Sequence, residues 1–186
     1  MQRIILASQS PRRKQLLQWA EVPFDVMIKE TDESYPEHLS PTDVAIYIAK
    51  NKALSIKVSD GDSIPILAAD TIVVLKNEII GKPIDREDAI NILSKLSGNK
   101  HLVITGVCIL FNNKEIVFAD TTEVEFHDLS LEQIVFYVDN YKPYDKAGAY
   151  AIQEWIGVVG IQSINGDFYN VMGLPVSRVV KELNKL

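Results

Sequence analysis

The chain has 186 residues, 47% of them apolar, which is the usual size and composition of one globular domain. Its formal net charge of −6 argues against a nucleic-acid coat or a polybasic membrane anchor, and no apolar run approaches the roughly 20 residues that span a membrane. The single cysteine, Cys108, excludes an internal disulfide and an all-cysteine zinc site, so we expect a cytoplasmic protein.

Apolar runs and helix-start signals alternate through the first half of the chain. Two helices are each expected to begin with a Ser-Pro pair, because serine suits the N-cap and proline the first helical position. The predicted elements are a strand over residues 3–7, a helix after Ser10, a strand over residues 24–28, a helix from Ser40 to about Val58, and two extended segments within residues 64–75 on either side of Ala69-Asp70-Thr71.

The second half adds more helices and a predicted hairpin. We expect a helix from Asp85 to just before Gly98, strands over residues 101–111 and 114–126 joined by a two-residue turn, a helix opened by a capping box at Ser130 that runs to about Asn140, strand-like segments over residues 155–164, and a last helix over residues 175–183. This order predicts a single α/β domain over residues 1–186 with a mixed, twisted sheet flanked by helices.

Two cations interrupt apolar helical stripes. Arg13 shares a face with Leu16 and Leu17, and Lys52 closes the stripe that contains Ile48 and Ala49. A buried, unpaired charge costs several kcal/mol, so each cation must pair, meet an anionic ligand, or lay its stem on the core with its head in water. The last alternative is the ordinary one for a single residue, but two such cations in neighbouring helices weaken it.

The segment from Ser8 to Arg13 lies between a predicted strand end and a helix start. Ligands of α/β sheets bind beyond the carboxyl ends of strands, and a helix N-terminus carries free N–H groups and partial positive charge. Two hydroxyls and two guanidiniums at this point suit an oligophosphate, although ordinary helix capping with solvated arginines is an equally good interpretation.

Acidic residues supply the second half of the predicted chemistry. Asp70 follows an apolar run, where a carboxylate can bind a divalent cation or accept a proton from water, or can simply cap a turn. Glu33 lies in an acidic loop that is either metal-facing or merely solvated.

Two further polar residues lie in predicted loops. Lys82, after Gly81, can reach a phosphate or stay in solvent. Gln153 ends a segment of small residues and can read a base edge, unless that segment is only a packed turn.

Taken together, these pieces resemble the Maf family of nucleotide pyrophosphatases, in particular the type that acts on dTTP and UTP. The resemblance covers essentially the whole chain. It rests on six ordered motifs: Ala7-Ser8-Gln9-Ser10-Pro11-Arg12-Arg13, Ala69-Asp70-Thr71, Gly81-Lys82-Pro83, Leu96-Ser97-Gly98, Asp145-Lys146-Ala147-Gly148-Ala149-Tyr150 with Ile152-Gln153, and Gly173-Leu174-Pro175.

The family resemblance implies an elongated domain with a central nucleotide-binding cleft between two lobes, a requirement for Mg²⁺ or Mn²⁺, and frequent homodimers. It implies that Asp70 and Glu33 are the catalytic and metal-facing carboxylates. Ser8, Arg13, Lys52 and Lys82 would grip the triphosphate.

Three further positions would select the base, because members that prefer 7-methyl-GTP differ there. Those members tend to carry a residue other than arginine in place of Arg12, glutamine in place of Thr71 and glutamate in place of Gln153. This chain has the pyrimidine-type residue at all three. The alternatives are the same hydrolysis of ITP-like nucleotides or 7-methyl-GTP, and a non-catalytic nucleotide sensor that regulates cell division.

Overall fold

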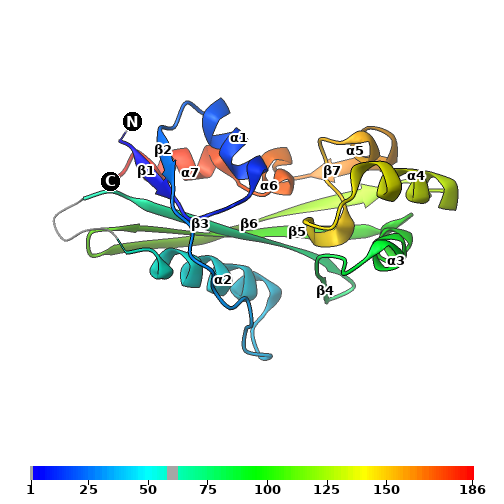
Figure 1. Cartoon of the computed structure of the whole chain (residues 1–186), viewed down its shortest axis with the longest axis horizontal. Coiled ribbons are helices and arrows are strands. Elements are labelled where there is room, and N and C mark those ends of the chain that lie inside the picture. Colours follow the sequence, from blue (N-terminus) through cyan, green and yellow to red (C-terminus); the bar gives the residue numbers. More distant parts are fainter. Residues whose placement is uncertain (1, 58–62) are drawn as a thin grey trace. The chain divides into compact units, whose positions relative to one another are not determined.

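A computed structural model describes residues 2–57 and 63–186 of the chain (Figure 1). Within these residues, seven strands form one mixed sheet in the order β2-β1-β3-β5-β6-β7, and β4 pairs with β3. The predicted α/β class with a mixed sheet is therefore confirmed. The chain divides into two compact units, and three long strands contribute residues to both: β3 (Ile66–Leu75), β5 (Lys100–Phe111) and β6 (Lys114–Phe126).

The first unit contains residues 1–71, 105–120 and 173–186. Its β1 pairs in parallel with both β2 and β3, in a register that sets Leu6 opposite Leu67. Figure 1 shows α2 on one face of these strands, with α1 and α7 on the other. The elements that belong wholly to this unit are β1 (Ile4–Leu6), α1 (Pro11–Trp19), β2 (Phe24–Val26), α2 (Pro41–Ser55) and α7 (Val176–Leu183).

Small residues bring α2 very close to the sheet of the first unit. Ala49 and Ala53 of α2 are fully buried in a cluster with Ala68 of β3 and Cys108 of β5. At Gly106 of β5, an added Cβ would lie 2.3–2.4 Å from backbone atoms of the helix. The absence of a side chain at Gly106 therefore determines how closely α2, and with it Lys52, approaches the strands.

The second unit contains residues 72–104 and 121–172. In its core, His101 of β5, Phe126 of β6 and Tyr150 meet edge to face, and α3 packs against α4 and the short helix η1. Its own elements are β4 (Glu78–Ile80), α3 (Arg86–Leu96), α4 (Leu131–Tyr141), η1 (Ala147–Ala149), α5 (Trp155–Gly160), β7 (Ile161–Asn165) and α6 (Phe168–Met172).

The helix starts lie where the capping signals predict them. In each case the side chain of the N-cap residue accepts a hydrogen bond from a backbone N–H in the first turn, which would otherwise have no partner. The four N-caps are Ser10 before α1, Ser40 before α2, Asp85 before α3, and Ser130 before α4, where Gln133 completes the capping box. The predicted hairpin between β5 and β6 is also present, and Asn112 in its turn has a φ of 53°.

The predicted break at Ala69-Asp70-Thr71 is wrong. β3 runs without interruption from Ile66 to Leu75, so Asp70 and Thr71 lie in the middle of a strand instead of at a turn. Asp70 remains in the strand because Lys52 pairs with its carboxylate, a compensation that lies 18 residues away in the sequence. The local pattern contains no sign of this partner, and an isolated aspartate ordinarily disfavours a strand.

The strand predicted over residues 155–164 is only half right. Trp155–Gly160 forms the helix α5, and the strand β7 begins at Ile161. Buried Ile156 and Gly160 are four residues apart, which is a helical period, but the run between Trp155 and Ile161 is apolar or glycine throughout. A short run of this kind does not distinguish a helix from a strand.

The described residues do not reach every predicted boundary. The predicted end of the second helix at Val58 falls outside the described residues, and the helix ends at Ser55. A single domain with two lobes around a cleft stays a prediction. No helix in the described part of the chain has the length and apolar character that crossing a membrane requires.

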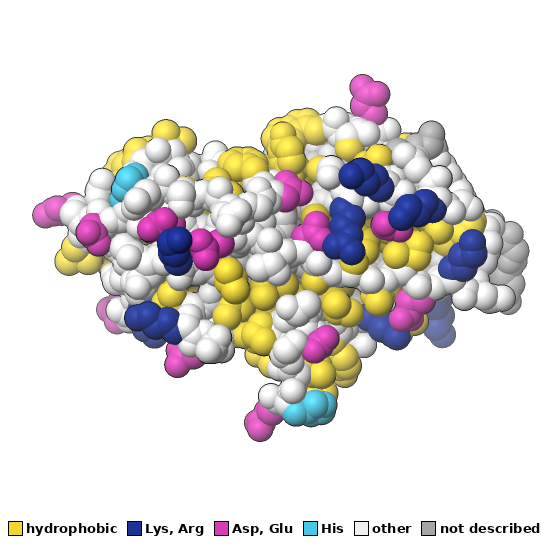
Figure 2. All heavy atoms as spheres, turned by 180° about the vertical axis from the view of Figure 1, so that it is seen from behind, with side chains coloured by type: hydrophobic (Ala, Val, Ile, Leu, Met, Phe, Trp, Pro, Cys, Tyr) yellow, Lys and Arg dark blue, Asp and Glu magenta, His cyan; other side chains and the backbone are white. Residues whose placement is uncertain are grey.

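Charged side chains of both signs mix on the surface. On the face in Figure 2, acidic side chains lie beside or among the basic ones. Exposed ion pairs account for part of this mixing, for example Lys50 with Glu115 at 2.7 Å and Lys100 with Glu123 at 3.0 Å. Such exposed pairs contribute little to stability, so they are expected to serve mainly solubility.

The close contact at Gly106 predicts a specific packing defect. In Gly106→Ala the new methyl group collides with the backbone of α2, so the helix must shift, and the free energy of unfolding should fall by about 1–3 kcal/mol. Urea unfolding measures this loss. Gly81→Ala is the matched control, because a Cβ there has no atom within 4 Å, and the two variants should not be equally stable.

Buried His101 predicts a loss of stability in acid. Only 2% of this residue is exposed, its Nε2 lies 2.7 Å from the Tyr150 hydroxyl, and burial lowers its pKa from 6.5 to about 4. The unfolded chain therefore binds a proton that the folded chain does not, and stability falls as the pH drops from about 6.5 to about 4. The loss should reach about 3 kcal/mol.

Urea unfolding across this pH range, with the neutral variant His101→Gln, measures the contribution. The pH dependence should be smaller in His101→Gln than in the native protein. Equal pH profiles for the native protein and His101→Gln would contradict the assignment.

Candidate active site

Ser8 begins the candidate site just beyond the carboxyl end of β1. Because Leu6 pairs in parallel with Leu67, the chain after β1 continues alongside the middle of β3, near Asp70. The Ser8 hydroxyl accepts hydrogen bonds from the backbone N–H of Ser10 at 3.2 Å and from Arg13 Nη1 at 3.1 Å. The strand-to-helix turn and the first turn of α1 are thereby tied to one serine oxygen.

Arg13 is buried, as the apolar stripe predicts, with 8% of the residue exposed. Its guanidinium donates to the Gly173 carbonyl at 2.7 Å, to Thr71 Oγ1 at 3.0 Å and to Ser8 Oγ. These bonds use three of the five N–H donors of an arginine, which leaves two for a ligand as far as the described residues go. Burial lowers the pKa of Arg13 from its ordinary value, and the negative charge of Asp70 opposes that shift.

Lys52 forms a second cluster with two carboxylates. Its Nζ lies 2.6 Å from Asp70 Oδ1 and 2.7 Å from Glu33 Oε1. The lysine and aspartate side chains are 18% and 14% exposed, whereas Glu33 reaches in from the surface with 47% of its side chain exposed. Of the alternatives open to Lys52, the structure shows pairing, and Asp70 is neither a turn residue nor a solvated one.

The two clusters lie on opposite faces of β3. Successive side chains of a strand point to opposite faces, so Asp70 faces α2 and Lys52 while Thr71 faces α1 and Arg13. The clusters adjoin through this pair of neighbouring residues. The arrangement sets two cations and two carboxylates around one short stretch of strand, with the charge of Arg13 close enough to respond to both Asp70 and Glu33.

Of the remaining predicted site residues, Arg12 adjoins Arg13 on α1, and its charge contributes to lowering the pKa of Arg13. Lys82 and Gln153 belong to the second unit and are both exposed there. Their roles toward a nucleotide stay predictions.

Within the second unit, two of the sequence motifs are bonded to each other. The backbone N–H of Gly148 donates to the carbonyl of Gly81, at 3.1 Å, which ties the loop carrying Lys82 to the segment that ends at Gln153. Gly148 has a φ of 71°. This segment includes the short helix η1, in which Gly148 and Ala149 are buried.

The residues on either side of Gln153 are held by buried groups. Tyr137, which is fully buried, accepts a hydrogen bond from the Ala151 N–H at 3.1 Å and donates to the Glu154 carboxylate. Lys146, only 7% exposed, lies 3.6 Å from the same carboxylate. The backbone that carries Gln153 is therefore anchored, although its side chain is exposed.

Sequence reasoning missed Gly173 as a partner of Arg13 and Thr105 as a partner of Thr71. Thr105 of β5 is fully buried, and its hydroxyl lies 2.9 Å from Thr71 Oγ1. Gly173 has a φ of 116°, a conformation that L side chains rarely adopt, and this conformation directs its carbonyl at Arg13. Gly173 belongs to the motif Gly173-Leu174-Pro175, so the sequence held a signal for it. Thr105 belongs to none of the six motifs, and no sequence signal pointed to it.

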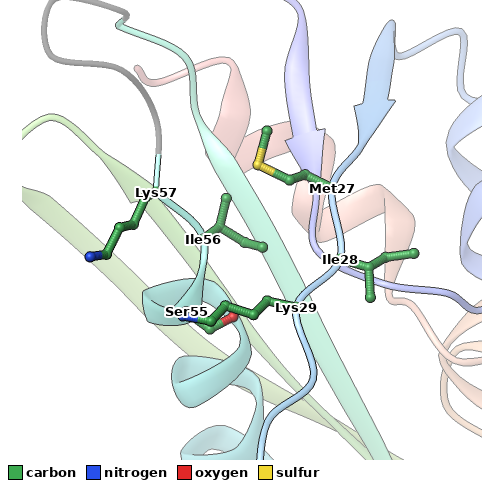
Figure 3. Close-up of a pocket in the computed structure, with 6 residues that line it drawn as sticks. All are labelled: Met27, Ile28, Lys29, Ser55, Ile56 and Lys57. Carbon is green, nitrogen blue, oxygen red and sulfur yellow. The ribbon is translucent and has the colours of Figure 1, made fainter.

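A pocket of about 240 Å³ lies between the segment after β2 and the end of α2 (Figure 3). Its apolar wall is formed by Met27, Ile28 and Ile56. The side chain of Lys57 points away from the other labelled residues, and Lys29 extends toward Ser55. The pocket contains none of the residues of the two clusters.

The donor set fits a hard cation. Asp70 and Glu33 offer carboxylate oxygens around a common cationic position, and oxygen donors are the ligands that Mg²⁺ prefers. No group of three or more His, Cys, Asp or Glu side chains in the described residues is arranged to hold a metal by itself. A cation at this site would depend on one or two carboxylates together with oxygens of a ligand.

Comparison with known proteins identifies the family to which the chain belongs. The sequence model of the family described as Maf-like protein matches residues 3–186. This chain belongs to the Maf-like family. Membership confirms the resemblance drawn from the six motifs and extends over nearly every residue of the chain.

Curated Maf-like relatives match along nearly their full length. A dTTP/UTP pyrophosphatase from Cytophaga hutchinsonii is 52% identical over 98% of this chain and 84% of its own. Proteins of the same name from Parabacteroides distasonis and Bacteroides fragilis are 47% and 44% identical, over 97% and 99% of this chain and 94% and 96% of their own. A solved dITP/XTP pyrophosphatase from Mycobacterium abscessus is much less similar, with 13% identity, a TM-score of 0.39 and coverage of 67% of this chain and 72% of its own.

Proposed function

We propose that this Maf-like protein hydrolyses dTTP and UTP to the nucleoside monophosphate and pyrophosphate. The observation that carries the proposal is the gathering of Asp70 and Glu33 on Lys52 Nζ, beside the buried Arg13. Two cations suit a triphosphate, and two carboxylates suit proton transfer or a divalent cation. The names of the full-length relatives support the same reaction and the same two nucleotides.

In the proposed reaction, water attacks the α-phosphorus. The bond between this phosphorus and the oxygen that bridges to the β-phosphorus breaks, and pyrophosphate leaves with the electron pair. Asp70 is proposed either to accept the proton of the attacking water or to hold the cation. A positioned base contributes roughly 10²- to 10⁴-fold to the rate.

The cations of the chain bind and neutralise the phosphates. Arg13 is held by three protein acceptors and has two N–H donors left for phosphate oxygens. Lys52, with Ser8 and Lys82, completes the proposed grip on the triphosphate. Because the pyrophosphate carries more charge as it leaves, a cation that is already fixed in place, as Arg13 is, stabilises this state more than the substrate.

A divalent cation, Mg²⁺ or Mn²⁺, is proposed to be held by Asp70 and Glu33 and would offset the charge on the phosphates. Lys52 would then share these carboxylates with the cation.

We also retain a homodimer and a cytoplasmic location as predictions. Light scattering of the purified protein tests the first.

Release of pyrophosphate from a panel of nucleoside triphosphates tests the function. Phosphate is measured with and without added inorganic pyrophosphatase, which converts pyrophosphate to phosphate. With dTTP and UTP, phosphate should appear only when this coupling enzyme is present. Chelation of divalent cations should stop the release of pyrophosphate. If ITP or 7-methyl-GTP were hydrolysed as fast as dTTP and UTP, the proposed substrates would be wrong. If nucleotides bound but no pyrophosphate was released from any of them, the alternative of a non-catalytic nucleotide sensor would be favoured.

In the same assay, Asp70→Asn should lower turnover roughly 10²- to 10⁴-fold and leave nucleotide binding, measured by calorimetry, largely intact. Asp25→Asn is the matched control, since it also removes a carboxylate from an ion pair of the first unit, but an exposed one with Arg3. Unchanged turnover in Asp70→Asn would remove this residue from the mechanism.

Base selection is predicted to depend on Gln153, with Arg12 and Thr71. A polar group that reads a base edge discriminates strongly, because a mismatched base leaves it unpaired. Gln153→Glu should therefore reduce kcat/KM for dTTP and UTP more than for other nucleotides, and exposed Gln162→Glu should not. Thr71→Gln should shift preference in the same direction, with an added loss on every nucleotide because Thr71 also bonds Arg13. An equal loss on all bases in Gln153→Glu would contradict the role.

A further inference from the structure

Thr105 is a buried polar residue that the proposed mechanism does not use. It lies in β5 with none of its surface exposed, on the opposite face of that strand from Gly106, which contacts α2. Its hydroxyl is 2.9 Å from Thr71 Oγ1, and Thr71 Oγ1 is 3.0 Å from Arg13 Nη2. A chain of two hydroxyls therefore leads from the centre of the sheet to the guanidinium.

The direction of the bonds follows from the chemistry of the groups. A guanidinium only donates, so Thr71 Oγ1 accepts from Arg13. The Thr71 proton must then go to Thr105 at 2.9 Å or to the Gly173 carbonyl at 3.4 Å, and the first distance is the normal one for an O–H···O bond. In either case the hydroxyl of Thr105 sets the orientation in which Thr71 meets Arg13.

We propose that Thr105 is a positioning residue for Arg13, acting through the Thr71 hydroxyl. With Ser8 and the Gly173 carbonyl, this pair of threonines holds the guanidinium so that its two remaining N–H donors face one phosphate group. The inference rests on the proposed function, and it deepens that function by assigning a residue to the phosphate grip. Because phosphate is common to all nucleotides, the contribution of Thr105 should not depend on the base.

Thr105→Val tests the proposal, because valine keeps the shape and removes the hydroxyl. Loss of one hydrogen bond in a charged network should raise KM roughly tenfold for dTTP and UTP alike, with kcat changed much less. Thr105→Ser should restore KM, since serine returns the hydroxyl. Thr122→Val is the matched control, as Thr122 is equally buried but bonds to Asp167 and Asn170, and its KM should equal that of the native protein.

A second measurement follows Arg13 itself and needs no turnover. The Arg13 Nε–H bonds to the Gly173 carbonyl, so its hydrogen exchange, followed by nitrogen-15 NMR, should be slow in the native protein and faster in Thr105→Val. Inorganic tripolyphosphate, used as a probe without a base, should bind Thr105→Val roughly tenfold more weakly by calorimetry.

The outcomes separate this inference from the proposed function. If the native protein releases no pyrophosphate from any nucleotide, the proposed function fails, while exchange at Arg13 and tripolyphosphate binding still decide the role of Thr105. An unchanged exchange rate or unchanged tripolyphosphate affinity in folded Thr105→Val overturns the inference. A KM that rises only for thymine and uracil nucleotides overturns it as well, because it assigns Thr105 to the base.

Discussion

Consecutive side chains of a strand point to opposite faces of its sheet, and this constraint organises the candidate site. Asp70 and Thr71 are neighbours in the middle of β3, so one of them meets Lys52 on α2 and the other meets Arg13 on α1. A turn at this position would have let both side chains point the same way. Because the strand is continuous, one helix packs on each face of it, and each helix contacts this pair of residues through one cation, Arg13 of α1 and Lys52 of α2.

The two cations are stabilised in different ways. Arg13 is buried, and three oxygen acceptors compensate the loss of water around its guanidinium. Lys52 is partly exposed and is neutralised by carboxylates that are themselves reactive groups. Arg13 is therefore held in place by the protein, and the proposed function assigns its two remaining donors to a phosphate. In the proposed function, Lys52 would share its two carboxylates with a metal ion.

Close packing connects the site to the core of the first unit. Gly106 lets the backbone of α2 approach β5, and alanines along α2 keep that approach continuous as far as Lys52. Gly173 plays the corresponding part on the other face, where its backbone conformation directs a carbonyl at Arg13. Two glycines therefore contribute to the chemistry without a side chain of their own, one through proximity and one through conformation. In the second unit, the buried Tyr137 and Lys146, together with the partly exposed Glu154, give comparable support to the segment that carries Gln153.

Local patterns in the sequence were enough to determine the α/β class, the N-caps at Ser10, Ser40, Asp85 and Ser130, and the hairpin at Asn112-Asn113, because these depend on groups a few residues apart. The helical period also identified Arg13 and Lys52 as charges facing the interior. Only the tertiary structure decided that Asp70 lies within a continuous strand, that residues 155–160 are helical, and that the Gly173 carbonyl bonds Arg13 while Thr105 bonds Thr71. Each of these features depends on a partner or on packing that is distant in the sequence, such as the Lys52 ammonium group that pairs with Asp70. The strength of such a contact depends on the distance between the two groups in space, and a local pattern of residues contains no information about that distance.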